Sequence, residues 1–240
     1  MTVGILCEGG ETDAPVLELI LSHLFPDTTF VICGVSKRAI FDAGDQLLGD
    51  LFGKAVDRVI ILWDLLPLGN QMGVASQWSE QPRRREQRQM LLQLLSRSEK
   101  LDSLLQQQAR FYEHKYEFSE ESVAHPNNEC NLFELVCVCY SLDGWLLSDH
   151  SLLCELASTD EHTMRRLDPD PGKPDQCLNP ALALKRVLGK APNKRWRYYN
   201  KHIHNRQIAE AYIRKGRVDR LRRSDSFRRV EEAIRRWGCA

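Results

Sequence analysis

Four short apolar runs constrain the fold of this 240-residue chain more than any other feature. They cover residues 3–7, 29–35, 59–63 and 135–140, and the third run is apolar at every position. Segments with a helical pattern of apolar residues separate them. Strands that are apolar on both faces and alternate with helices are typical of a parallel sheet covered on both sides. We therefore expect an α/β fold with a mainly parallel sheet.

The segments between these strands predict specific helices. Apolar positions from Val16 to Leu24 predict a first helix, and Ser36 is expected to cap a second helix that ends near Phe52. A polar helix is expected over about 80–96, and a further helix should contain residues 145–147. The remaining polar stretches 106–108 and 120–131 are interpreted as connections.

The proline-rich stretch 168–174 is the clearest loop, and we place a domain boundary there. Residues 1–167 are expected to form the α/β domain and residues 168–240 a basic, mainly helical region. Pro180 should begin one helix, residues 208–214 should carry a second, and Asp225 should cap a third.

The charge distribution points to a phosphate-bearing partner. Residues 181–240 hold 18 Lys and Arg against five Asp and Glu, a net charge of +13, whereas residues 1–180 carry −13. A basic region of this density is typical of nucleic-acid binding. The alternative is that the basic region docks on the acidic body of the same chain or of a second copy.

Several function classes find no support in the sequence. No run of 18 apolar residues predicts a membrane span, and the first residues do not resemble a signal peptide, so we expect a cytoplasmic protein. Neither a Gly-x-Ser-x-Gly motif nor a P-loop is present. The eight cysteines include no Cys-x-x-Cys pair, and we interpret them as packing residues.

Two acidic residues stand where ligands gather in an α/β sheet. Glu8 ends the first strand and Asp64 the third, and the carboxyl ends of parallel strands share one edge. Carboxylates at this edge predict a site for Mg²⁺ or Mn²⁺, which activates water and offsets charge on a phosphoryl group. Glu11 and Asp13 follow within a turn, where they also suit the start of the next helix.

The segments Cys7–Asp13 and Ile60–Asp64 resemble the Toprim domain of topoisomerases, primases and OLD-type nucleases. A closer resemblance is to small Toprim-like proteins that accompany ATPases in phage-defence loci. It extends to residues 142–149, to 199–205 and to Ser226-Phe227. The resemblance implies a three-layer α/β/α fold, metal-dependent phosphodiester chemistry and a separate ATPase subunit.

The resemblance also implies roles for individual residues. Glu8 matches an acid/base or metal-binding glutamate, Asp64 a metal-binding aspartate, and Asp143 an acidic position that precedes a tryptophan. Leu66 stands where the Toprim pattern has its second aspartate, and an extra glycine in the first motif permits a register with Gly9 in the place of Glu8.

The basic region supplies candidate nucleic-acid contacts, in which arginines alternate with aromatic residues. They are Arg195, Arg197, Tyr199, Lys201, His204, Arg222 and Arg223. The aromatic residues suit stacking on unpaired bases, and packing of the C-terminal helices is the equal alternative. The leading hypothesis is a Mg²⁺- or Mn²⁺-dependent nuclease that acts on DNA or RNA in anti-phage defence. The alternative is a catalytically silent subunit that binds nucleic acid or a partner.

Overall fold

The computed structural model describes residues 1–65, 80–116, 131–163, 173–177, 179–189, 196 and 198–238, with residues 80–83 and 116 described by their backbone only. Its contacts divide the chain into two compact units. The first, here called the sheet unit, comprises residues 1–10, 27–137 and 233–240. The second, the helical unit, comprises residues 11–26 and 138–232. The boundary that composition places at residue 168 stays a prediction.

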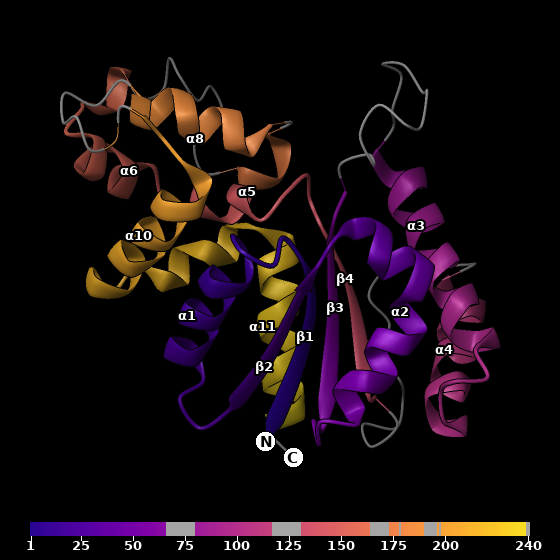
Figure 1. The fold of residues 1–240 in the computed structure, drawn as a ribbon. Helices are drawn as coiled ribbons and strands as arrows, with labels where there is room; N and C mark the ends of the chain where they lie inside the picture. The colour runs from indigo at the N-terminus through magenta and orange to yellow at the C-terminus, as the bar shows by residue number, and fades with distance from the viewer. Residues whose placement is uncertain are drawn as a thin grey trace. The chain divides into compact units, whose positions relative to one another are not determined.

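The sheet unit is built on four parallel strands in the order β2-β1-β3-β4 (Figure 1). They are β1 (Thr2–Glu8), β2 (Thr29–Val35), β3 (Arg58–Asp64) and β4 (Phe133–Val138). The first three match the apolar runs of the sequence to within one residue at each end. The fourth lies two residues earlier than predicted. Its buried Phe133 and Glu134 extend it toward the N-terminus, and Tyr140 with its positive φ of 61° lies past its end.

Helices cover both faces of this sheet and give three layers. On one face lie α2 (Lys37–Phe52), α3 (Glu80–Arg97) and α4 (Ser103–Tyr116), whose apolar residues share one core with Leu6, Ile61 and Leu135. On the other face lie the last turns of α11 (Asp225–Gly238), where Arg236 reaches within 3.5 Å of Glu134 on β4. The predicted α/β/α architecture with a parallel sheet is confirmed.

Helix α2 begins as its sequence predicts. Ser36 is extended, and its hydroxyl accepts a hydrogen bond from Ala39 N–H at 3.2 Å, which satisfies one donor of the first turn. The helix ends at Phe52, as expected, and Gly53 follows its last residue.

Helix α4 corrects the interpretation of residues 106–108 as a connection. Leu105, Ala109 and Tyr112 are buried at helical spacing, so packing decides the conformation of this glutamine-rich stretch. Gln108 is itself buried, and its amide donates to Phe133 O and accepts from Leu132 N–H, both at 2.7 Å. It therefore satisfies backbone groups at the start of β4. Most of the other expected connection, 120–131, falls outside the described residues.

The helical unit confirms that the region after residue 173 is mainly helical. Its helices are α1 (Ala14–Leu24), α5 (Asp143–Leu146), α6 (His150–Ala157), α8 (Pro180–Gly189), α10 (Lys201–Arg214) and the first half of α11. Two 3₁₀ helices, η3 (Pro174–Gln176) and η4 (Val218–Arg223), complete it.

Two local predictions in this unit need adjustment. The helix expected to contain residues 145–147 is the short α5, which ends at Leu146, and Asp149 caps a separate helix by accepting from Leu152 N–H at 3.0 Å. Asp225 is the first residue of α11, and Ser224 Oγ accepts from Phe227 N–H at 3.5 Å in the place expected for Asp225.

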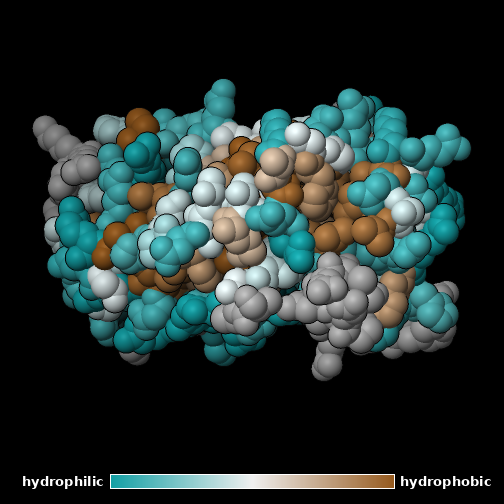
Figure 2. All heavy atoms as spheres, turned by 90° about the horizontal axis from the view of Figure 1, so that it is seen from below, coloured by the Kyte–Doolittle hydropathy of each residue, from teal (hydrophilic) through white to brown (hydrophobic). Residues whose placement is uncertain are grey.

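On the face seen in Figure 2, hydrophobic side chains lie at several places among hydrophilic ones. Among the described residues, large hydrophobic side chains are exposed mainly as single positions such as Met90, Leu104 and Ile203. Scattered residues of this kind are ordinary on protein surfaces. None of the described helices has the length and apolar character needed to cross a bilayer.

Candidate functional site

The structure brings Glu8 and Asp64 together at the carboxyl edge of the sheet. Each ends its strand, and Asp64 N–H donates to Glu8 Oε2 over 3.3 Å. Both side chains are partly exposed. Lys37 completes this strand-end cluster, since its ammonium donates to the Asp64 carbonyl oxygen and its side chain is buried.

Charges around Lys37 show how close these groups lie. Burial lowers the pKa of Lys37, and the carboxylates of Glu8 and Asp64 oppose that shift. Each carboxylate is therefore near enough to the ammonium to stabilise its charge. The sequence interpretation missed Lys37, because its place beside Glu8 depends on β2 lying next to β1.

Cys137 on β4 lies in the same neighbourhood. Burial raises the pKa of its thiol to about 12, and the charges of Arg84, Lys37 and Arg88 lower it only partly. The thiol therefore stays protonated near neutral pH and is a poor metal ligand or nucleophile. Arg84 and Arg88 come from α3, whose Gln87 accepts a hydrogen bond at 2.9 Å from the Trp63 indole. Helix α3 thus brings positive charge to the strand-end cluster.

A glycine turn holds Glu8 in place. Gly9 has a φ of 82° and donates to Val35 O at 3.1 Å, which ties the end of β1 to the end of β2. A Cβ on Gly34 would lie 2.0 Å from Gly10 Cα, so the close approach of these two backbones requires glycine. Gly9 therefore forms the turn, and Glu8 is the residue at the strand end.

Asp143 belongs to the helical unit, where it forms part of a second polar cluster. Asp143 Oδ1 accepts from Asn205 at 2.6 Å and from Tyr199 OH at 3.3 Å, and Lys201 Nζ lies 3.3 Å from Oδ2. The same ammonium lies 3.1 Å from Asp13. These five residues are here called the Asp13–Asp143 cluster. The role of Asp143 as a metal ligand stays a prediction.

Burial dominates the electrostatics of this cluster. It raises the pKa of Asp13 to about 6, an effect that Lys201 opposes and Asp143 reinforces. Burial and the nearby Asp143 also raise the pKa of Tyr199, so its hydroxyl remains a donor. One ammonium thus compensates two carboxylates.

The raised pKa of Asp13 predicts a pH dependence of stability. The folded state binds a proton on the Asp13 carboxyl more tightly than the unfolded state does, so this proton stabilises the fold. Its contribution to the free energy of unfolding is complete below pH 4 and is lost as the pH rises through 6. Between pH 4.5 and pH 7.5 the loss amounts to about 2 kcal/mol. Urea unfolding of Asp13→Asn should show wild-type stability falling by this amount relative to the variant. If the free energies of unfolding of the wild type and of Asp13→Asn change in parallel with pH, the pKa of Asp13 is not raised. The control is Asp27→Asn, which changes an aspartate in an exposed turn.

The residues predicted to contact nucleic acid, where the structure describes them, make contacts with other residues of this chain. Tyr199 and Lys201 belong to the Asp13–Asp143 cluster, and buried His204 stacks on Tyr199 with its Nδ1 2.7 Å from Asn200 N. Arg222 makes a bidentate ion pair with Glu231, and Arg223 donates to Ser148 O at 2.9 Å. Arg195, Arg197 and Leu66 fall outside the described residues.

Two other segments of the resemblance are in contact in the helical unit. The Trp145 ring meets Phe227 edge-on with centroids 5.1 Å apart, and its indole donates to Ser226 at 2.8 Å. These positions therefore pack the interior. Among the residues that the structure describes, no group of three or more His, Cys, Asp or Glu is arranged to hold a metal ion.

Comparisons with known proteins leave the chain without an assigned relative. No family model, no curated protein and no solved structure matches it.

Proposed function

We propose that this chain is a divalent-metal-dependent nuclease that hydrolyses phosphodiester bonds of DNA or RNA at the strand-end cluster. The observation that carries the proposal is the hydrogen bond from Asp64 N–H to the Glu8 carboxylate. It sets two acidic residues on neighbouring parallel strands at the edge where α/β proteins bind ligands.

The donor set fits Mg²⁺ or Mn²⁺. Magnesium is commonly held by one or two carboxylates, with water and substrate phosphate as its other ligands. Glu8 and Asp64 would hold the ion, which when bound lowers the pKa of a water molecule and offsets charge on the phosphoryl group. Arg84 and Arg88 bring positive charge to the same edge, where it suits a phosphate backbone.

Lys37 has a separate part in this proposal. Its buried ammonium fixes the Asp64 backbone and faces both carboxylates, so it limits their mutual repulsion before a metal binds. The position of the Lys37 ammonium beside both carboxylates also favours a second candidate function. A fixed cation beside both carboxylates also suits a catalytically silent subunit that binds nucleic acid without metal.

The test is a cleavage panel with the full chain. Labelled duplex DNA, single-stranded DNA and transfer RNA are incubated with Mg²⁺, Mn²⁺ or EDTA. We expect cleavage of at least one substrate with either metal and none in EDTA. Binding of nucleic acid without cleavage under every condition would contradict the nuclease and support the silent subunit.

The resemblance to Toprim-like proteins of phage-defence loci extends this proposal to a biological setting. We place the nuclease in the cytoplasm, with a separate ATPase subunit as its partner. Co-purification from cells that express both chains tests this association.

A further inference from the structure

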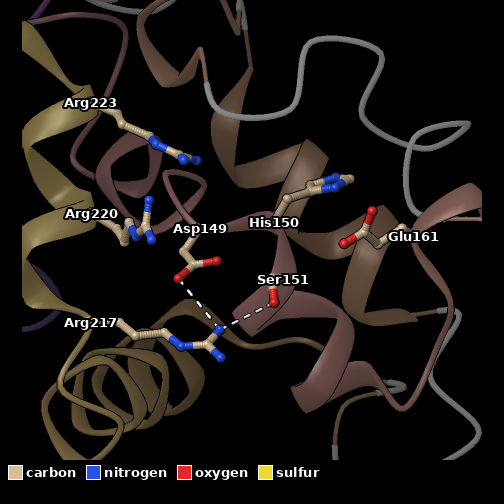
Figure 3. A pocket seen from close by; sticks show the side chains of 7 residues that line it. All are labelled: Asp149, His150, Ser151, Glu161, Arg217, Arg220 and Arg223. Carbon is tan, nitrogen blue, oxygen red and sulfur yellow. Dashed lines mark hydrogen bonds and ion pairs between the residues drawn. The ribbon is translucent and has the colours of Figure 1, made fainter.

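A second charged region lies wholly within the helical unit, around an open cavity of about 430 Å³. Three arginines line it, namely Arg217 directly before η4, and Arg220 and Arg223 within η4 (Figure 3). Asp149, His150 and Ser151 from the start of α6 line it as well, and Glu161 completes it. A cavity of this size is in the range of small-molecule sites.

The 3₁₀ geometry of η4 explains why three arginines meet there. A 3₁₀ helix has three residues per turn, so residues three apart lie one above another. Arg217, Arg220 and Arg223 have this spacing, whereas Val218 and Leu221 are buried at the same spacing. One side of the segment therefore packs inward and another presents guanidinium groups to the cavity.

The three arginines differ in their internal contacts. Arg217 is held by Glu155 at 2.6 Å and lies 3.6 Å from Asp149, so it shapes the wall. Arg223 gives one N–H to Ser148 O, and a guanidinium carries five N–H donors. Arg220 has a long contact of 4.0 Å with exposed Asp219, a pair of little energetic value.

The cavity is lined by charged groups of both signs. Three arginines face two carboxylates, and Asp149 is already near Arg217. The forked guanidinium donors of Arg220 and Arg223 suit a phosphate monoester. Glu161 lies across the cavity from the arginines (Figure 3), where its carboxylate can accept a hydrogen bond from a hydroxyl or amino group of the same ligand.

We propose that this cavity binds a nucleotide through a terminal phosphate monoester, either a free mononucleotide or the end nucleotide of a strand. Arg220 and Arg223 hold the phosphate, and Glu161 accepts hydrogen bonds from the sugar or base. The proposal goes beyond the proposed cleavage and does not depend on it, because its test is binding in EDTA.

The experiment compares AMP, adenosine, inorganic phosphate and one oligonucleotide with either a 5′-phosphate or a 5′-hydroxyl, by titration calorimetry of the full chain. We expect AMP, the 5′-phosphorylated oligonucleotide or both to bind at least about tenfold more tightly than the matching ligand without phosphate. Whichever phosphorylated ligand binds identifies the source. Equal binding with and without the phosphate, or inorganic phosphate binding as tightly as AMP, would overturn the proposal.

Variants assign the roles of the residues. Arg220→Gln should weaken binding of the phosphorylated ligand at least about tenfold, whereas Glu161→Gln should weaken AMP more than inorganic phosphate. The matched control is Arg214→Gln, an exposed arginine of α10 outside the lining of the cavity. If Arg220→Gln binds like Arg214→Gln, the assignment of the phosphate contact is wrong.

Discussion

Asp64→Asn is expected to slow metal-dependent cleavage at least about a hundredfold, which corresponds to about 2.7 kcal/mol of lost transition-state stabilisation. The change removes one of the two carboxylates at the strand ends but keeps the size of the side chain. The backbone N–H of residue 64 still donates to Glu8, and its carbonyl still accepts from Lys37. A metal ion that has lost a charged ligand binds more weakly and offsets less phosphoryl charge.

Glu8→Gln should give a loss of similar size for the same reason. Its amide oxygen can still accept the hydrogen bond from Asp64 N–H, so the turn that follows β1 should persist. Asp27→Asn is the matched control, because Asp27 is exposed in the turn before β2, at the opposite edge of the sheet.

The measurement is the initial cleavage rate of the substrate found by the panel, beside the urea midpoint of each variant. Unchanged cleavage by Asp64→Asn, with an unchanged midpoint, would remove Asp64 from the active site. A fall in rate that equals the fall caused by Asp27→Asn would have the same meaning.

The sheet could be predicted from the sequence because its evidence is local. Each strand is a short, mainly apolar run, and the helix after β2 carries its own capping serine. Helix α4 could not be predicted in this way. Its run of glutamines is typical of a loop. Gln108 can be buried because backbone groups at the start of β4 are hydrogen-bond partners for its amide.

The candidate site was predictable only in part. The ends of parallel strands share one edge, so the pairing of Glu8 with Asp64 follows from the order of elements. Lys37 joins them through the neighbouring position of β2, which the sequence does not state. The Asp13–Asp143 cluster depends on residues 188 positions apart, and no local pattern shows that one ammonium serves both carboxylates.

The Asp13–Asp143 cluster also gives the largest expected effect on stability. Asp143→Ala should lower the free energy of unfolding by about 3–5 kcal/mol, the cost of breaking a buried charge network by removing one partner. Asp143 is almost fully buried, and its carboxylate accepts from Asn205, Tyr199 and Ser141 as well as facing Lys201.

The reason for this cost is what the substitution leaves behind. The buried amide of Asn205 loses an acceptor, and an unsatisfied buried donor costs about 1–3 kcal/mol, whereas the Tyr199 hydroxyl keeps Asn205 Oδ1 as its acceptor. Lys201 keeps only one of its two carboxylates. Asp143→Asn retains an acceptor oxygen but removes the charge, so we expect a smaller loss than for alanine.

Urea unfolding in EDTA measures this effect apart from any role of Asp143 in binding metal. The matched control is Asp219→Ala, whose side chain is 61% exposed and whose loss should change stability by no more than about 0.5 kcal/mol. If Asp143→Ala is as mild as Asp219→Ala, the carboxylate does not hold the network together. If it is severe and Asp143→Asn is intermediate, the cluster first stabilises the helical unit, and metal binding by Asp143 requires evidence of its own.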